Sequence, residues 1–501
     1  MTEELRGNKY NRYSGVLMNI SSLPGPFGIG VFGEEAQEFA RKIREMGFSY
    51  WQILPLGPLD RGNSPYCGES AFAGNELYID PRQLRSAGLI SDSDLQSSYY
   101  NGTPYTADYN FAKEKRREVL ERAYYNYKAG NFPEIKGDFL SFIRQNDWVE
   151  DYGRFKALKE QNDGKPWIDW EITTADEDRA GYYKFVQFLF YRQWLSLKAF
   201  VNGLGVKIIG DIPLYLAYDS CDVESCPGEF RLNKETRRPE VVAGVPPDYF
   251  SEEGQLWGNP IYNWAEMKKN GYKWWKKRIS TALSLYDVLR IDHFRGLASY
   301  WAVPAEAKTA MEGHWEEGPR MDLFKSLKKV CEKGEIIAED LGVLGEDVIK
   351  LLADTGFAGM RVVQFGFDET HNSTNLPHKY PENTVAYLGT HDNNTLFGWL
   401  WEATPEERAY ALDYCGFKGA DWTAGGYKSE SCRAVIETVW KSAARLSIIA
   451  FQDLCGFGKD ARMNIPGVPD YNWRFRTTKE TIDGIDAEYF LKINRLYGRC
   501  L

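Results

Sequence analysis

Short apolar segments alternate with helical segments along this chain, and this alternation is the feature that most restricts its fold. Runs that are apolar on both faces are typical of parallel strands covered by helices. Eight such runs occur, at 16–22, 50–55, 206–213, 288–293, 335–340, 359–365, 384–392 and 446–453. Helical patterns lie between many of them, at 33–47, 182–205, 272–286, 319–334 and 346–356.

This order of segments predicts an α/β fold, a (β/α)8 TIM barrel, with an open doubly wound sheet as the alternative. A plain barrel needs about 250 residues, whereas this chain has 501. We assign the surplus to two inserted subdomains, 61–175 after the second strand and 214–270 after the third. The catalytic barrel then consists of residues 12–60, 176–213 and 271–501. Both insertions follow the C-terminal end of a strand, where barrel enzymes build their sites.

Charge and cysteine content argue against several classes of protein. The formal net charge is −10, whereas a nucleic-acid or anionic-membrane partner would require a basic face. The eight cysteines are too few for a disulfide scaffold and form no CxxC pair, so we expect free thiols in the cytoplasm. The polar first 15 residues have no apolar core of a signal peptide, and no long apolar stretch occurs.

Two patterns that would indicate a cofactor or a metal are weak. Gly28, Gly30 and Gly33 match GxGxxG after a strand, but the next strand does not end in an acidic residue that could hold a ribose. A tight strand-to-helix loop is the better interpretation. The five histidines, at 293, 314, 371, 378 and 391, form neither HxH nor HExxH. We therefore expect no cofactor and no catalytic metal.

Aromatic residues make up 15% of the chain, with 16 Trp and 31 Tyr. Tyr and Trp are amphipathic and suit surfaces that are partly wet and partly apolar, as sugar rings are. An aromatic-rich core is the alternative, and composition alone favours it.

Several of the predicted strands end in acid, at Asp211, Asp292, Glu339 and Asp392. In a barrel these ends gather at one mouth, where unpaired like charges repel unless one is protonated or a cation lies among them. Arg290 shares a side of its strand with Asp292, and its guanidinium would keep that carboxylate ionised. An ionised carboxylate beside a protonated acid is the pair that glycoside chemistry requires. A purely structural ion pair is the alternative.

Several stretches resemble a known family. RIDHFRG, IAEDLG and LGTHDN resemble the catalytic strand ends of the α-amylase clan. The match is narrowed by SPYCGESAFAGN (64–75), GDIPLYLAYDS (210–220), GVPPDYFSEEGQLWGNPIYNW (244–264), MRVVQFGFD (360–368) and RMNIPG (462–467). Together they resemble the 4-α-glucanotransferases called amylomaltase or disproportionating enzyme, from about residue 14 to the C-terminus. The resemblance implies a barrel without the C-terminal β-sandwich of ordinary amylases, and fewer than 50 residues follow residue 453.

The resemblance also implies roles for individual residues. Asp292 resembles the nucleophile, Glu339 the general acid and base, and Asp392 the transition-state stabiliser, while Arg290 looks like the residue that orients Asp292. Asp340, the neighbour of Glu339, is expected to be structural. Residues that resemble substrate contacts are Ser64, Tyr66, Asp211, Gln255, Trp257, His293, Asp368, His391 and Asn464. GNSPY and AGNELYI depart from the family's usual GDSPY and AGNP, which affects the detail of the subsites.

The implied reaction transfers an α-1,4-glucan segment from a maltooligosaccharide donor to an acceptor glucan or glucose. We expect retention of configuration, with the carboxyl groups of Asp292 and Glu339 about 5 Å apart. Transfer requires that water be excluded, and the aromatic loop 244–260 suits that purpose. The alternatives are a hydrolytic α-glucosidase or amylase of the same clan and a catalytically inactive glucan-binding protein.

Overall fold

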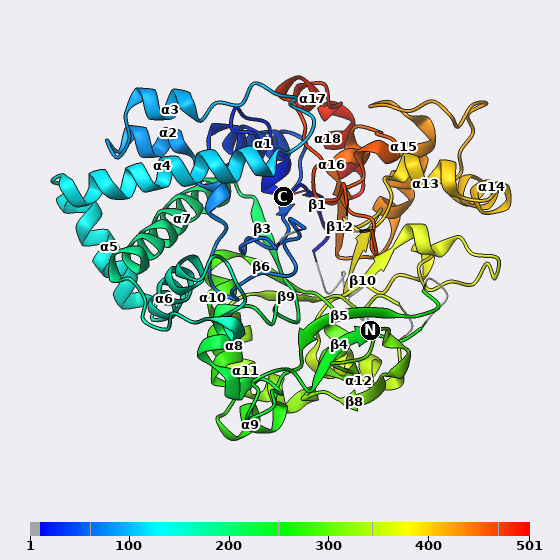
Figure 1. Ribbon diagram of the computed structural model, residues 1–501. Helices are drawn as coiled ribbons and strands as arrows, with labels where there is room; N and C mark the ends of the chain where they lie inside the picture. The colour runs from blue at the N-terminus through cyan, green and yellow to red at the C-terminus, as the bar shows by residue number, and fades with distance from the viewer. Residues whose placement is uncertain (1–10, 61, 248–250, 343, 469, 501) are drawn as a thin grey trace, which may run out of the picture.

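Eight parallel strands form one sheet at the centre of the molecule (Figure 1). The computed structural model describes residues 11–60, 62–247, 251–342, 344–468 and 470–500. The strands are β1 (Tyr13–Leu17), β2 (Tyr50–Gln52), β3 (Lys207–Ile212), β6 (Val288–Ile291), β9 (Glu335–Ala338), β10 (Gly359–Val362), β11 (Thr384–Tyr387) and β12 (Leu446–Ala450). They follow the order β10-β11-β12-β1-β2-β3-β6-β9. A parallel bridge between Ile337 and Ala358 joins the two ends, so the predicted barrel is confirmed.

Helices surround these strands, and the five predicted from the sequence are confirmed. They are α1 (Glu34–Glu45), α7 (Glu177–Gly203), α10 (Lys273–Leu285), α11 (Arg320–Cys331) and α12 (Glu346–Thr355). The helices that follow β11 and β12 are α13 (Leu396–Glu402), α14 (Pro405–Tyr414), α15 (Glu430–Lys441), α16 (Phe451–Leu454), α17 (Lys479–Asp483) and α18 (Ala487–Leu496). α1 buries Phe39 and Ile43 and has acids in its first turn and bases in its last, as the helix dipole favours.

The first strand differs most from its predicted bounds. It begins at Tyr13, three residues before the predicted start at residue 16, and a 3-10 helix already occupies Ile20–Ser22. Gly15 explains the shift, because a Cβ there would lie 2.7 Å from the Cβ of Tyr50 on the neighbouring strand. The strand thus starts with small and polar residues that an apolar pattern does not detect.

Two long segments leave the barrel after β2 and β3. The first contains the helices α2 (Pro81–Ser86), α3 (Asp92–Ser97), α4 (Tyr109–Ala129), α5 (Pro133–Gln145) and α6 (Trp148–Gln161). The second contains α8 (Cys221–Ser225), β4 (Val241–Val245), β5 (Gln255–Pro260) and α9 (Trp264–Lys269). β4 and β5 form an antiparallel sheet with β7 (Ser299–Pro304) and β8 (His314–Glu317), two strands that the sequence did not reveal. The division into subdomains 61–175 and 214–270 stays a prediction.

The hydrophobic core has two main parts, one inside the barrel and one between the barrel and its helices. Met360, Val385, Tyr387 and Ile448 belong to the inner cluster, which fills the barrel as layers of side chains do in this architecture. Within the described part of the chain, no strand follows β12. Nor does any helix described there combine the length and the apolar character needed to cross a membrane. The closed core leaves the C-terminal ends of the strands as the place for polar chemistry.

Candidate active site

The four acidic strand ends lie together at the mouth of the barrel. Asp211 is the fifth residue of β3, Asp292 and Glu339 directly follow β6 and β9, and Asp392 lies five residues beyond β11. Their charges act on one another: beyond the effect of burial, Asp211 and Asp392 raise the pKa of Asp292, and Asp292 raises that of Glu339. The parallel register of the barrel therefore brings together acids that are up to 181 positions apart, from 211 to 392.

Arg290 connects two of these acids. Its Nη1 lies 2.6 Å from Oδ2 of Asp211 and 2.9 Å from Oδ1 of Asp292. The Tyr66 hydroxyl donates to the same Oδ2 of Asp211 at 2.8 Å. Burial raises the pKa of Asp292 to about 6, and the charge of Arg290 opposes this rise. Because its side chain is 29% exposed while that of Arg290 is 4% exposed, Asp292 presents a carboxylate to the mouth with a buried cation behind it.

Glu339 has a different environment, in which two backbone N–H groups donate to its carboxylate. Its Oε2 accepts from the backbone N–H of His293 at 2.8 Å and its Oε1 from that of Leu341 at 2.7 Å. Burial raises the pKa of Glu339 to about 7, and the charge of Asp292 adds to this rise. Since the guanidinium of Arg290 contacts Asp292, Glu339 is the member of the pair that keeps its proton to higher pH.

The residue after Asp292 has a strained backbone. His293 has φ of 52°, in the left-handed region that non-glycine residues rarely adopt. This conformation ends the strand and accompanies the hydrogen bond from its N–H to Glu339. Burial lowers the pKa of the His293 imidazole to about 3, so the ring is neutral at physiological pH. Strain of this kind concentrates at functional sites.

Asp340, adjacent to Glu339, is engaged in the barrel wall. Its side chain accepts hydrogen bonds from the backbone N–H of Met360 at 2.5 Å and from Arg361 at 3.2 Å. It is 3% exposed, which leaves little access to a ligand. Its geometry fits a structural role.

Asp392 is held by two neighbouring segments. Its Oδ1 accepts from Nδ2 of Asn464 at 2.6 Å and lies 3.4 Å from Nε2 of His391. Arg462 donates to the backbone carbonyl of Asp392 and, from Nε at 2.8 Å, to that of Asn464. The sequence analysis missed Arg462, although it begins the RMNIPG stretch two positions before Asn464. One arginine thus fixes both partners of this contact.

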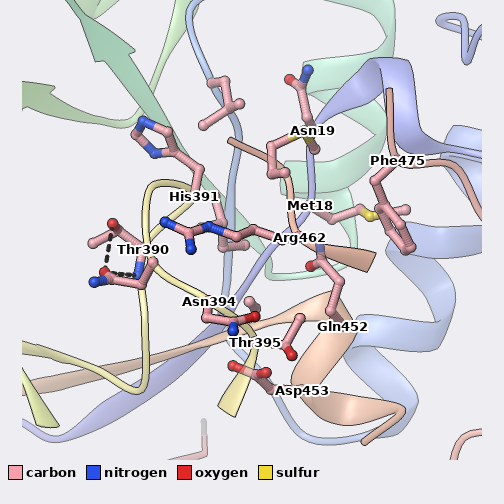
Figure 2. A pocket seen from close by; sticks show the side chains of 15 residues that line it. Met18, Asn19, Thr390, His391, Asn394, Thr395, Gln452, Asp453, Arg462 and Phe475 are labelled. Carbon is pink, nitrogen blue, oxygen red and sulfur yellow. Dashed lines mark hydrogen bonds between the residues drawn. The ribbon is translucent and has the colours of Figure 1, made fainter. Parts of the chain in front are cut away.

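A pocket lies behind the segment that carries Asp392. Figure 2 shows His391, Arg462, Asn394 and Asp453 among the side chains that line it. Burial raises the pKa of Asp453 to about 7, while its Oδ1 accepts from the backbone N–H of Leu396 at 2.7 Å. The polar side chains there support the start of α13 and, through it, the position of Asp392.

The aromatic residues predicted to contact substrate lie on two sides of the acids. Tyr66 stacks on His391 with ring centroids 5.0 Å apart, and its N–H donates to the Ser64 hydroxyl at 3.2 Å. On β5, the Trp257 indole N–H donates to the side chain of Gln255 at 3.1 Å.

Trp257 also approaches the residue that follows Asp292. Its ring meets that of His293 edge to face with centroids 4.7 Å apart. Tyr215, which the sequence analysis did not single out, lies 6.4 Å from both rings. Trp257 therefore belongs to the mouth of the barrel. Residues 248–250 of the predicted loop 244–260 lie outside the described residues.

Asp368 is a predicted site residue that contacts a residue of its own turn. Its carboxylate is exposed and accepts from the backbone N–H of Thr370 at 2.9 Å and from the hydroxyl of the same residue. These bonds close its own turn. Its role as a substrate contact stays a prediction.

Comparisons with known proteins agree on one family. The family model described as 4-alpha-glucanotransferase matches residues 18–481. The 4-alpha-glucanotransferase of Clostridium butyricum is 41% identical over 96% of this chain and 100% of its own, and that of Thermus thermophilus is 42% identical over 93% and 94%. The amylomaltase of Streptococcus agalactiae in complex with acarbose superposes with a TM-score of 0.91 at 39% identity, covering 98% of this chain and 100% of its own.

Proposed function

Because this chain belongs to the 4-alpha-glucanotransferase family and is a glycosyltransferase acting on α-1,4-glucans, we propose that it transfers glucan segments with retention, through a covalent intermediate on Asp292. The observation that carries this mechanism is the asymmetry of two adjacent acids. Asp292 has the Arg290 guanidinium 2.9 Å away, whereas Glu339 is held by two backbone N–H groups. The first is suited to stay ionised and the second to hold a proton.

In the first step, a carboxylate oxygen of Asp292 attacks the anomeric carbon of the donor. The glycosidic bond breaks as Glu339 gives its proton to the leaving oxygen, and the shortened glucan departs with a new 4-hydroxyl group. In the second step, the 4-hydroxyl of an acceptor attacks the same carbon, Glu339 takes its proton, and the bond to Asp292 breaks. Two inversions at one carbon give net retention.

Asp392 stabilises the positive charge that develops on the sugar between these steps. Asn464 occupies Oδ1 of Asp392 at 2.6 Å, which leaves the other oxygen to bind sugar hydroxyls. On one side Tyr66 offers a ring stacked on His391, and on the other Trp257 and His293 meet edge to face. We assign the first pair to the donor and the second to the acceptor. Ser64, Asp211 and Gln255 support these groups through the contacts described above, and Asp368 is proposed as a more distant substrate contact.

Incubation with maltotriose tests the reaction. A transferase releases glucose and longer maltooligosaccharides while the total number of reducing ends stays constant. A hydrolase of the same clan raises the number of reducing ends, and an inactive glucan-binding protein yields no product. A steady rise of reducing ends equal to the glucose released would reject the proposal.

The pair of acids predicts a bell-shaped pH dependence of kcat/KM with maltotriose. Asp292 must be ionised, so activity falls as pH drops through the lower apparent pKa of the pair, near 6. Glu339 must be protonated in the first step, so activity falls as pH rises through the upper one, near 7. We expect the maximum between these values. Stopped assays from pH 4 to about pH 9 measure it, and a flat profile across this range would contradict the assignment.

Replacing Trp257 with alanine is expected to raise the share of hydrolysis about five- to tenfold, because water gains access to the intermediate. The ratio of new reducing ends to glucose formed from maltotriose measures this share. Leu256→Ala is the matched control: it is 39% exposed against 37% for Trp257 and faces the opposite side of the same strand. Equal ratios in both variants would show that the loop does not exclude water.

Maltooligosaccharides and longer α-1,4-glucans are the proposed substrates, and the cytoplasm is the proposed location. The location is supported by the cysteines: all eight lie in the described part of the chain and are free thiols. Thiols persist in a reducing compartment.

A further inference from the structure

An exposed pair of tryptophans lies beyond the barrel mouth, on the segment that follows Asp392. Trp401 is in the last turn of α13 and is 55% exposed. Trp422, in the loop between α14 and α15, is partly exposed, and its ring centroid is 4.8 Å from that of Trp401 with the planes tilted by 55°. We call these two rings the aromatic platform. An exposed indole pair of this kind marks a binding surface more often than an isolated apolar residue does.

The platform is held in place before any ligand binds. The Arg408 guanidinium lies 4.4 Å from the Trp422 ring centroid and donates to the carbonyls of Leu400 at 3.2 Å and Ala403 at 3.0 Å. The Ser431 hydroxyl donates to the carbonyl of Trp422 at 2.9 Å. Because both segments are fixed to the protein, little side-chain entropy is lost when a ligand stacks on the rings.

The platform is continuous with the rim of the active site. α13 begins at Leu396, four residues after Asp392. Glu402, the neighbour of Trp401, acts on Arg462: burial lowers the pKa of that guanidinium, and the charges of Glu402 and Asp392 both oppose this. Arg462 in turn donates to the backbone carbonyl of Asp392. Helix α13 thus connects the platform to the segment of Asp392, and the charge of Glu402 acts on the arginine that holds this segment.

We propose that the aromatic platform binds the outer part of a long α-1,4-glucan whose inner part occupies the active site. The two faces of a pyranose ring carry C–H groups that pack on indole rings, while its hydroxyls stay in water. Two rings tilted by 55° suit successive units of a curved chain better than one flat surface would. Asp421 and Thr423 are exposed on either side of Trp422, and Thr423 donates to Oδ1 of Asp421 from its N–H and its hydroxyl. The second carboxylate oxygen of Asp421 can accept from a sugar hydroxyl at the edge of the ring. This inference rests on the proposed action on α-1,4-glucans.

The consequence is a preference for long substrates. A glucan held at the platform raises the effective concentration of its remaining units at the cleft, which strengthens binding without any new contact in the active site. We expect maltotriose to be too short to occupy both places at once, so it should gain nothing. The platform therefore acts on KM for polymers and leaves kcat and the chemistry unchanged.

The test compares Trp401→Ala and the double variant Trp401→Ala/Trp422→Ala with the wild type, using amylose, glycogen and maltotriose as substrates. KM for the two polymers is expected to rise about five- to tenfold, while kcat and KM for maltotriose change less than about twofold. Tyr125→Ala is the matched control, because Tyr125 is 64% exposed on α4, on the opposite side of the molecule from α13 (Figure 1). Thermal unfolding midpoints show whether each variant is folded.

A binding measurement separates the platform from the chemistry. We measure the fraction of Asp292→Asn protein that sediments with insoluble amylose. Adding Trp401→Ala to this variant is expected to remove most of that bound fraction. If the bound fraction does not change, or if KM rises equally for maltotriose and amylose, the platform does not bind glucan as proposed. If the double variant fails to fold, the single variant Trp401→Ala, at an exposed position, provides the test. Failure of the wild type to disproportionate maltotriose would instead reject the proposed function and would be visible in the same assay.

Discussion

Replacing Asp292 with asparagine is expected to lower kcat with maltotriose about 10⁴- to 10⁶-fold, because the side chain keeps its shape but cannot form the glycosyl-enzyme. The fold is expected to tolerate the change. Burial raises the pKa of this carboxyl to about 6 in the folded protein. A folded-state pKa above the unfolded value means that the ionised form costs stability, increasingly as pH rises through that pKa. At pH 8 an uncharged amide should therefore leave the unfolding midpoint unchanged or slightly higher.

A buried acid to which we assign a structural role provides the control. Asp340 is 3% exposed and is bound to the backbone N–H of Met360 and to Arg361. Burial also raises the pKa of the Asp340 carboxyl, so Asp340→Asn should leave the protein folded and reduce kcat less than about tenfold. Glucose release and thermal unfolding are measured on both variants. If Asp292→Asn kept more than a hundredth of the activity, or if both variants lost activity equally, Asp292 could not be the nucleophile.

The mouth of the barrel was predictable because two regularities fix it. Parallel strands end at the same face of a barrel, so acids at the ends of apolar runs must gather there. Residues two apart on a strand share a side, which placed Arg290 next to Asp292. The structure adds that Arg290 also binds Asp211, on the neighbouring strand. That contact follows from the register of β3 and β6, which pairs Asp211 with Arg290.

Other parts of the site depend on contacts between segments that no local pattern relates. The Tyr66 hydroxyl reaches Asp211 across 145 positions, and Arg462 reaches the Asp392 carbonyl across 70. β8 (HWEE) has four residues, of which three are exposed, so no apolar run marks it. Trp257 lies at the mouth only because β5 pairs with β4. The family resemblance indicated Tyr66 and Trp257, whereas periodicity alone did not, and neither singled out Arg462.

Replacing Glu339 with glutamine is expected to separate the two chemical steps. With maltotriose, kcat should fall about 10³-fold, because no acid protonates the leaving oxygen. With α-maltosyl fluoride, whose fluoride leaves without a proton, the first step should stay within about tenfold of the wild-type rate. The second step still lacks the base that activates the acceptor hydroxyl. The glycosyl-enzyme should therefore accumulate, and intact-mass spectrometry should detect protein heavier by one maltosyl unit, with the adduct mapping to Asp292.

Accumulation of the adduct requires that Asp292 attack the anomeric carbon while Glu339 only transfers the proton. A double variant tests this division directly. Asp292→Asn/Glu339→Gln should form no adduct with α-maltosyl fluoride, because the attacking carboxylate is absent. In Glu339→Ala, which leaves space beside the intermediate, azide should discharge the adduct, since this anion attacks the anomeric carbon without needing a base. An adduct on any other residue, or rapid turnover of the fluoride by Glu339→Gln, would mean that Glu339 is not the proton carrier.

The backbone N–H groups of His293 and Leu341 hold Glu339 in the ground state. The amide oxygen of glutamine can accept from one of these N–H groups, whereas its NH2 group cannot accept from the other. One of the two hydrogen bonds therefore remains to position the side chain, and the reaction with the fluoride measures the chemical loss separately from any displacement.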